Sequence, residues 1–282
     1  MSAVAEVRHA PPPRHEPPTQ KMPGHWLLAK MGKRVLRPGG LQLTHRLLQA
    51  LAIGAHDDVV EFAPGLGVTA RLTLARNPAT YRAVERDPAA AATVLRYLAS
   101  PRQQCVIGTA EATGLPSESA SVVYGEAMLS MQVATAKARI VTEAARLLRP
   151  GGRYGIHELC LVPDDVSQTV RDEIERALSD EIHVGVRPLT RCEWRETLQA
   201  AGFQIAAEHQ APMHLLEPRR LVQDEGLLRA ARFVWNVARH GQARKRVLAM
   251  RRVFRKYHNH LAAIAMVAVK SSPGDSTLKT VT

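Results

Sequence analysis

The sequence predicts an α/β fold with a mostly parallel sheet, and three observations support this prediction. Short apolar runs bounded by turn residues recur over residues 58–157, and helix-length segments separate them. Hydrophobic residues make up 45% of the 282 residues, which is enough for a packed core. Strand, helix and strand repeated in this order are typical of a parallel sheet with crossover helices on its faces.

The elements of this repeat can be assigned one by one from the apolar pattern. Strands are predicted at residues 58–62, 81–85, 104–107, 121–124 and 152–157. Helices are predicted between them, at residues 68–76, 89–99 and 133–148, the last with Ile140, Ala144 and Leu147 on one stripe.

The pattern changes after residue 188. Thr190 and Glu193 have the spacing of a capping box, which predicts a helix that starts there and ends before Gly202. The last two strands are predicted at residues 203–208 and 261–269. The Arg-rich region between them predicts a helical cap over 212–258, with helices at about 219–239 and 243–257 on either side of His240 and Gly241.

The two ends of the chain have a different composition. Residues 1–23 contain six prolines and few large apolar residues, so they predict a disordered Pro-rich tail, and residues 271–282 predict a flexible tail. One domain is expected over 24–270, opened by an N-terminal helical segment at 24–54. No run of 18 apolar residues and no secretory pattern occur, which predicts a cytoplasmic protein.

Basic charge is concentrated in two segments of the chain. The net charge is +12, of which residues 217–260 carry +9 and residues 1–46 carry +6, whereas residues 47–216 are acidic at −4. A basic cap favours an acidic or lipid-bound acceptor and peripheral contact with an anionic membrane surface. Nucleic acid is a rival partner, but twelve aromatic residues and no RNA-reading module do not favour it.

Three cysteines are present, at widely spaced positions 105, 160 and 192. This number and spacing predict neither a disulfide framework nor a zinc site, so no metal is expected.

The most informative local motif is the loop that follows the first predicted strand. Gly65 and Gly67 come just after that strand and open a helix, so the backbone there can approach a ligand and present free N–H groups to it. Residues 65–70 also fit the pattern G-x-G-x-x-A, which keeps a dinucleotide such as NADP as an alternative ligand. Glu85 at the end of the second strand suits a ribose in either case.

Glu61 distinguishes the two ligands. Its carboxylate lies two residues before the turn, where it would repel a pyrophosphate but would suit an ammonium group. S-Adenosylmethionine has an amino group, a ribose and no phosphate. The pattern therefore favours methyl transfer over an NADP-dependent oxidoreductase, and a cofactor-binding protein without catalysis is kept as a third alternative.

These residues resemble motif I of class I S-adenosylmethionine-dependent methyltransferases, of the methyltransferase domain 11 type. Further segments follow in the order of that family: 85–88 is similar to its ribose-binding strand end, 108–116 to its segment beside the adenine, and 148–152 to its turn into the fifth strand. The resemblance is close over residues 55–160. It implies S-adenosylmethionine as cofactor, bound by Glu61, Ala63, Gly65, Gly67, Glu85, Thr109 and Ala110.

The resemblance also implies a Rossmann-like sheet of seven strands in the order 3-2-1-4-5-7-6, with the last strand antiparallel and the cap inserted before it. Two residues depart from the family pattern. Ala63 replaces the usual first glycine, and Pro64 is expected to hold it extended. Thr109 replaces a common aspartate, which weakens the expected contact with the adenine amine.

Methyl transfer from a sulfonium is an in-line displacement, in which the protein mainly aligns and dehydrates the reactants. A general base is needed only if the acceptor must lose a proton. Glu126 and His157, at the ends of the fourth and fifth strands, are the predicted catalytic residues. We hypothesise that Lys33 or Arg37 lies near the carboxylate of the cofactor. The expected acceptor is a small molecule, lipid-like or polyaromatic, methylated on oxygen, carbon or nitrogen.

Overall fold

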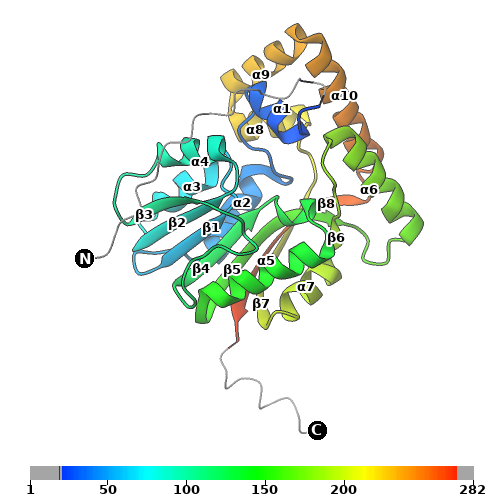
Figure 1. Cartoon of the computed structure of the whole chain (residues 1–282). Coiled ribbons are helices and arrows are strands. Elements are labelled where there is room, and N and C mark those ends of the chain that lie inside the picture. The colour runs from blue at the N-terminus through cyan, green and yellow to red at the C-terminus, as the bar shows by residue number, and fades with distance from the viewer. Residues whose placement is uncertain (1–18, 20, 272–282) are drawn as a thin grey trace.

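The computed structural model describes residue 19 and residues 21–271, and its centre is a twisted sheet (Figure 1). Within the described residues the sheet has eight strands, and seven of them follow the order β3-β2-β1-β4-β5-β8-β7. The eighth, β6, pairs with β5 over two residues. The bounds are β1 Asp58–Phe62, β2 Thr80–Glu85, β3 Gln103–Ile107, β4 Ala120–Glu126, β5 Leu148–Leu161, β6 Leu189–Thr190, β7 Phe203–Pro212 and β8 Leu261–Lys270.

This topology confirms the predicted order, because β7 and β8 are the sixth and seventh strands that the sequence predicts. The strands β3, β2, β1, β4 and β5 are parallel to one another, and β8 runs antiparallel to β5 and β7. The short β6 was not predicted, since two residues are too few to show a pattern of alternation.

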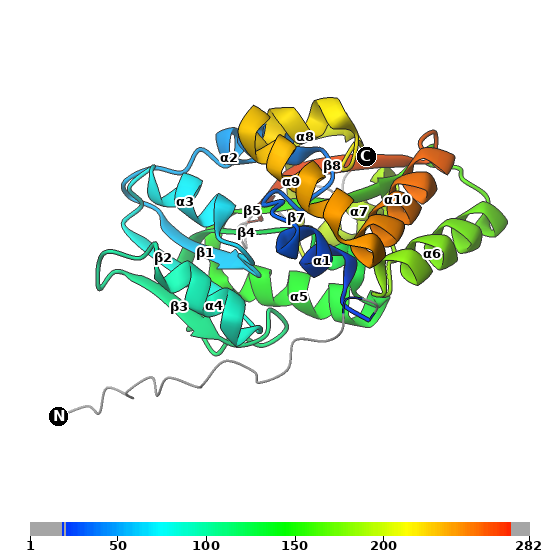
Figure 2. The ribbon, with the colours of Figure 1, turned by 90° about the horizontal axis from the view of Figure 1, so that it is seen from above.

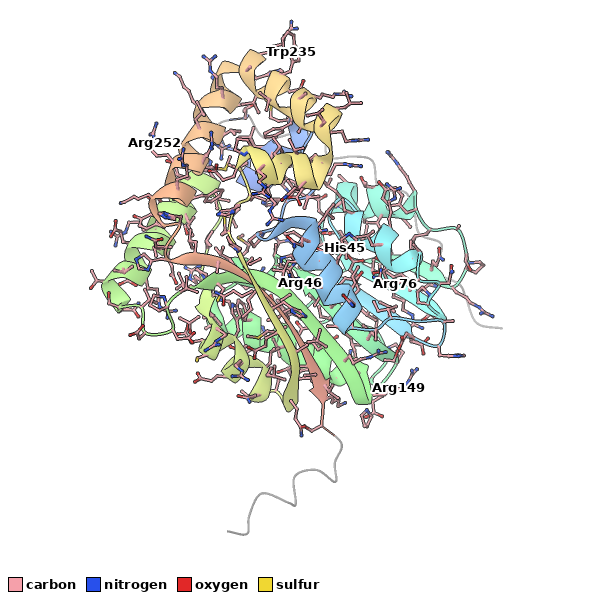
Figure 3. All side chains as sticks on the ribbon, turned by 180° about the vertical axis from the view of Figure 1, so that it is seen from behind. His45, Arg46, Arg76, Arg149, Trp235 and Arg252 are labelled. Atoms are coloured by element: carbon pink, nitrogen blue, oxygen red, sulfur yellow. The ribbon has the colours of Figure 1, made fainter. Side chains whose placement is uncertain are left out.

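Helices cover both faces of the sheet, as the pattern predicts for parallel strands. Val59 belongs to the apolar core that contains the buried side chains of α2, whereas its neighbour Val60 belongs to the core that contains those of α5 and α7. Figures 1 and 3 show α5 and α2 on these opposite faces. The helices of the two layers are α2 Gly40–Ala50, α3 Val68–Leu74, α4 Pro88–Leu95, α5 Ala134–Leu147 and α7 Arg191–Gln199.

The remaining helices form a cap beyond the ends of the parallel strands (Figure 2). They are α1 Gly24–Lys30, α6 Gln168–Ile182, α8 Pro218–Glu225, α9 Leu227–Arg239 and α10 Gly241–Lys256, and their buried side chains form a separate apolar core. The prediction of two cap helices was wrong in one respect. Gly226, with φ of 78°, ends α8 and begins α9, so the first predicted helix is two.

The capping box predicted at Thr190 is confirmed, since the Thr190 side chain and the Glu193 side chain each bond the other's backbone N–H. The predicted tails 1–23 and 271–282 lie mostly outside the described residues. At their inner ends Met22 is buried and Ser271 donates a backbone hydrogen bond to Gly202, so ordered packing extends slightly beyond 24–270. No helix of the described part of the chain is long and apolar enough to cross a membrane.

Candidate active site

A cavity of about 390 Å³ lies between the ends of the parallel strands and the cap. This volume falls in the usual range for small-molecule sites. Its sheet side is lined by the loop after β1, the end of β2, the segment after β3 and the end of β4. Of the predicted site residues, the lining includes Glu61, Ala63, Gly65, Glu85, Thr109, Ala110 and Glu126, whereas Gly67 and His157 do not line the cavity.

The loop after β1 turns earlier than the sequence predicts. Ala63 still donates its N–H to Val84 of β2 at 2.9 Å, yet its φ is 49°, so the expectation that Pro64 holds Ala63 extended was wrong. The chain has only a few residues in which to reverse from β1 into α3, and the turn closes with Gly67 N–H donating to the Pro64 carbonyl at 2.9 Å. Ala63 therefore adopts a left-handed conformation that glycine would adopt at lower cost.

Gly67 serves the packing of the loop. Its φ is 70°, and a Cβ there would lie 2.7 Å from the Tyr97 ring. The glycine lets α3 begin against that ring, which explains why the motif needs a glycine at a position outside the cavity.

Replacing Ala63 by glycine is expected to raise the free energy of unfolding by about 0.5–1 kcal/mol, because it relieves the left-handed conformation. The measurement is chemical denaturation of both proteins. Ala92→Gly, at an exposed position inside α4, is the matched control and should lower the stability by about 1 kcal/mol. Equal losses for the two variants would contradict the strain at Ala63.

Glu85 is fixed at the end of β2 by two backbone donors. Its carboxylate accepts the N–H of Gly65 at 3.0 Å and the N–H of Asp87 at 3.0 Å. The side chain thus ties the glycine loop to β2 and is held ready to accept hydrogen bonds from a ligand hydroxyl pair.

Glu61 is buried at the base of the cavity between two tyrosines. The hydroxyls of Tyr81 and Tyr124 both donate to its carboxylate. Burial raises the pKa of Glu61 to about 7, although the two hydroxyl donors act in the opposite direction. A nearby cation from a ligand would stabilise the ionised form of this carboxylate.

Glu126 is the centre of a buried polar cluster that joins four parts of the chain. Its carboxylate accepts hydrogen bonds from Thr44 at 2.7 Å, from Thr69 and from His157 at 2.7 Å, and it pairs with the Arg37 guanidinium at 3.3 Å. Burial raises its pKa, but Arg37 and His157 outweigh burial and lower it to about 2. Glu126 is therefore a fixed anion at neutral pH.

His157 lies behind Glu126, with no exposed surface. Its Nδ1 contacts Glu126 at 2.7 Å and its Nε2 contacts the Pro38 carbonyl at 2.6 Å. Both ring nitrogens are thus occupied by protein oxygens and the ring has no exposed surface, so neither nitrogen is available to a substrate. This geometry argues against the predicted catalytic roles of His157 and Glu126 and favours positioning roles instead.

Arg37 is the part of this cluster that points to a ligand. Its Nε donates to Thr44 at 2.6 Å, whereas its Nη2 is buried and has no hydrogen-bond partner among the described residues. Arg37 lines the cavity. An unpaired guanidinium N–H in such a place is costly unless an anion fills it.

Lys33, the other basic residue predicted for the cofactor carboxylate, does not line the cavity. Its Nζ lies 3.8 Å from Asp224 and 3.9 Å from Glu225 of α8. It belongs to the contact between the N-terminal segment and the cap.

The cap side of the cavity is mostly apolar, although His25, Arg34, Arg37 and Gln132 also line it, and the sequence pattern did not reveal this side. Its lining comes from α1, the segment before α2, η1 (Leu129–Met131), α6, the segment before α8, and α10, and includes Leu28, Leu36, Met131, Leu178, Ile182, Val186, Met213, Leu215, Met250 and Phe254. Glu158 lies buried beneath this side, where its carboxylate accepts three backbone N–H groups of residues 128–130 and so holds η1 in place.

His25 of α1 also lines the cavity. Burial lowers its pKa to about 4, with Arg86 acting in the same direction, so its imidazole is neutral at pH 7. This residue was not predicted, because nothing in the local sequence pattern places α1 next to the residues that follow β2.

The polar groups of the sheet side fit S-adenosylmethionine. The unpaired Arg37 Nη2 suits its carboxylate, Glu61 its ammonium, and Glu85 its ribose hydroxyls, while Thr109 and Ala110 border the place for a base. Of these residues, only Thr109 and Ala110 are adjacent in the sequence.

Comparison with known proteins points in the same direction. A sequence profile of the family described as a methyltransferase domain matches residues 60–156. An uncharacterized protein of Haemophilus influenzae is 31% identical over 252 residues, which are 88% of this chain and 98% of that protein.

Many solved structures share the fold, among them the following two. A protein of Galdieria sulphuraria, provisionally assigned as a sarcosine dimethylglycine methyltransferase, has a TM-score of 0.65 and 14% identity over 82% of this chain and 86% of its own. A phosphoethanolamine N-methyltransferase of Haemonchus contortus, in complex with phosphomonomethylethanolamine and S-adenosylhomocysteine, has a TM-score of 0.66 and 13% identity over 88% of this chain and 57% of its own.

Proposed function

The chain belongs to the class I S-adenosylmethionine-dependent methyltransferases, and we propose on this premise that it methylates a small apolar acceptor, lipid-like or polyaromatic, on oxygen, carbon or nitrogen. S-Adenosylmethionine is its cofactor and supplies an electrophilic methyl group when bound. The observation that carries the proposal is the division of one cavity into a polar sheet side and an apolar cap side.

The sheet side is proposed to hold the cofactor. Glu85 would accept the ribose hydroxyls, Glu61 would face the ammonium and Arg37 the carboxylate. Gly65 and Ala63 let the loop backbone come close, and Thr109 and Ala110 would border the adenine. Gly67, Glu126 and His157 support this arrangement from behind, through the packing of the loop and the anchoring of Arg37 and Pro38.

The cap side is proposed to hold the acceptor. Side chains such as Leu215, Met250 and Phe254 offer a surface that favours an apolar body over a charged one, since burying an unpaired charge there is costly. The exclusion of water by these residues also favours displacement at a sulfonium, because water no longer competes as the nucleophile. Delivery of a lipid-like acceptor from an anionic membrane surface agrees with the basic cap.

Alignment is the main contribution expected from the protein in this in-line displacement. Glu126 and His157 are already saturated with hydrogen bonds, so neither is assigned as a general base. His25 lines the cavity and is neutral at pH 7, so it is the lining residue best suited to accept a proton from the acceptor. Its pKa of about 4, however, makes it a weak base. The site therefore favours acceptors that attack without help from a strong base.

Titration calorimetry tests the proposed cofactor site. The protein is expected to bind S-adenosylmethionine and S-adenosylhomocysteine but not NADP. Glu85→Gln should weaken both by roughly tenfold and Glu85→Ala by more, because the hydroxyl acceptors and the anchor of Gly65 are lost.

Asp165→Ala, which removes an exposed carboxylate outside the cavity lining, is the matched control and should bind as the wild type does. Binding of NADP alone would overturn the proposed cofactor site. Acceptors can then be screened by transfer of a labelled methyl group, where a preference for charged, strongly hydrated acceptors over apolar ones would contradict the role of the cap side.

A further inference from the structure

Helix α9 exposes a second apolar face. Ala230, Phe233 and Val237 point into the cap core. On other sides of the same helix Leu227 is 71% exposed, Leu228 87%, Val234 56% and Trp235 60%. A helix whose apolar residues extend well beyond the face that the fold covers is typical of a contact surface.

This face continues onto α8 across a shallow groove. Val222 of α8 is 41% exposed and lies at the groove with Pro218 and Leu221, opposite Val234, Trp235 and Ala238 of α9. Every residue that lines the groove is apolar. Together these side chains form one patch, which we call the α8–α9 face.

Arginines border the patch. Arg229, Arg232 and Arg239 are exposed on α9. The 100° step of a helix places Arg232 and Arg239 on the flank next to Leu228 and Trp235, and Arg229 farther round on the same side. The guanidinium of Arg239 lies 5.2 Å from the centre of the Trp235 ring. An apolar face edged with arginine combines the two features that favour adsorption to an anionic lipid surface.

Negative charge is almost absent from the outside of α8, α9 and α10, the cap helices that follow β7. Residues 217–260 contain twelve Lys and Arg against three acids. Asp224 and Glu225 are buried against the N-terminal segment, where Glu225 accepts the N–H groups of Arg34 and Val35, and Glu217 pairs with Arg251. The α8–α9 face therefore presents positive charge that its own helices do not neutralise.

The position of the face suits delivery of an apolar ligand. Figure 3 shows Trp235 at the outer tip of the cap, pointing away from the sheet. The cap also lines the cavity, through Met250 and Phe254 of the adjoining helix α10. A surface that touches the α8–α9 face would thus lie next to the element that covers the apolar side of the cavity.

We propose that the α8–α9 face docks the protein on an anionic membrane surface. Leu227, Leu228 and Trp235 enter the interfacial layer, and Arg229, Arg232 and Arg239 contact lipid phosphates. This inference stands on the exposed face alone and does not depend on the acceptor or on methyl transfer.

Vesicle flotation of the full chain tests the proposal. Binding is expected to vesicles of phosphatidylcholine mixed with phosphatidylglycerol, to be weak on phosphatidylcholine alone, and to fall with salt. Replacing Arg229, Arg232 and Arg239 by Gln should weaken binding by roughly 100-fold, at about fivefold for each arginine. Leu228→Ser with Trp235→Ser should weaken it by roughly tenfold or more.

Two variants serve as matched controls. Leu95→Ser removes an exposed leucine at the end of α4, and Arg102→Gln removes an exposed arginine just before β3, at the opposite end of the sheet from the cap. Both should bind vesicles as the wild type does. Titration of every variant with S-adenosylhomocysteine reports separately on the fold and the cofactor site, so failure of vesicle binding is distinguishable from failure of the proposed function.

Two outcomes would overturn the proposal. The first is no binding to anionic vesicles, and the second is equal binding by the wild type and the patch variants. If the wild type does not bind vesicles but the patch variants abolish a dimer in sedimentation, or binding to RNA, the face serves that other partner.

Discussion

Replacing Arg37 by methionine is expected to weaken binding of S-adenosylhomocysteine by roughly 10- to 100-fold, the range for losing a hydrogen bond to a charged group. The reason is the buried Nη2 of Arg37, which lines the cavity and has no partner among the described residues. If this atom binds the amino-acid carboxylate of the ligand, a ligand without that carboxylate should not detect the change. Binding of 5′-methylthioadenosine is therefore expected to be the same in the variant and the wild type.

Two further variants distinguish a direct contact from a loss of structure. Arg37→Lys keeps the positive charge beside Glu126 without the forked donor set, so it should restore part of the affinity. Arg46→Met removes an exposed arginine from α2, labelled in Figure 3, and should leave both ligands unaffected. Equal losses for the two ligands in Arg37→Met would assign Arg37 to the structure of the cluster and not to the carboxylate.

The sheet could be predicted from the sequence because its strands are local patterns. The first strand was predicted at its exact bounds, and β4 and β5 differed mainly in length, since β5 runs on to Leu161 through a stretch that pairs with β8. The division of the cap into α8 and α9 was missed because a glycine inside a helical pattern is compatible with both one helix and two.

The candidate site could be predicted only where the chain order places residues at strand ends. Glu85 and Glu126 are the last residues of β2 and β4, and Glu61 is the last but one of β1. Because these strands are parallel neighbours, the three carboxylates lie at the same edge of the sheet. The contact of His157 with Pro38 and the apolar cap side join segments more than a hundred residues apart, and no local pattern encodes such contacts. The left-handed Ala63 was missed because the restriction before proline is a preference, and the closure of the turn overrides it.

Glu61→Gln is expected to make the protein more resistant to unfolding at high pH. Burial raises the pKa of Glu61 from 4.5 to about 7, so ionisation of this group lowers the free energy of unfolding. The protonated carboxyl therefore contributes to the stability of the folded state, and this contribution is fully present below about pH 4.5 and is lost as the pH rises through about 7. The loss in the free energy of unfolding amounts to about 3 kcal/mol. Glutamine keeps an oxygen for the hydroxyls of Tyr81 and Tyr124 but cannot ionise. The gain in unfolding free energy from the substitution should therefore grow between about pH 5 and pH 8, as urea denaturation would show.

Ligand binding should show the opposite pH dependence, because an ammonium group at Glu61 needs the ionised carboxylate. Below about pH 7 the wild type must release a proton as it binds S-adenosylhomocysteine, so its affinity should fall by up to about tenfold for each pH unit. Calorimetry in buffers of different ionisation enthalpy counts that proton directly. In Glu61→Gln the proton release should vanish and the affinity should be low and nearly independent of pH over this range. A wild type that binds equally well at about pH 6 and pH 8, with no proton released, would show that Glu61 keeps its proton with the ligand bound. In that case the buried carboxyl serves only to link Tyr81 and Tyr124 in the core, and the ammonium lies elsewhere.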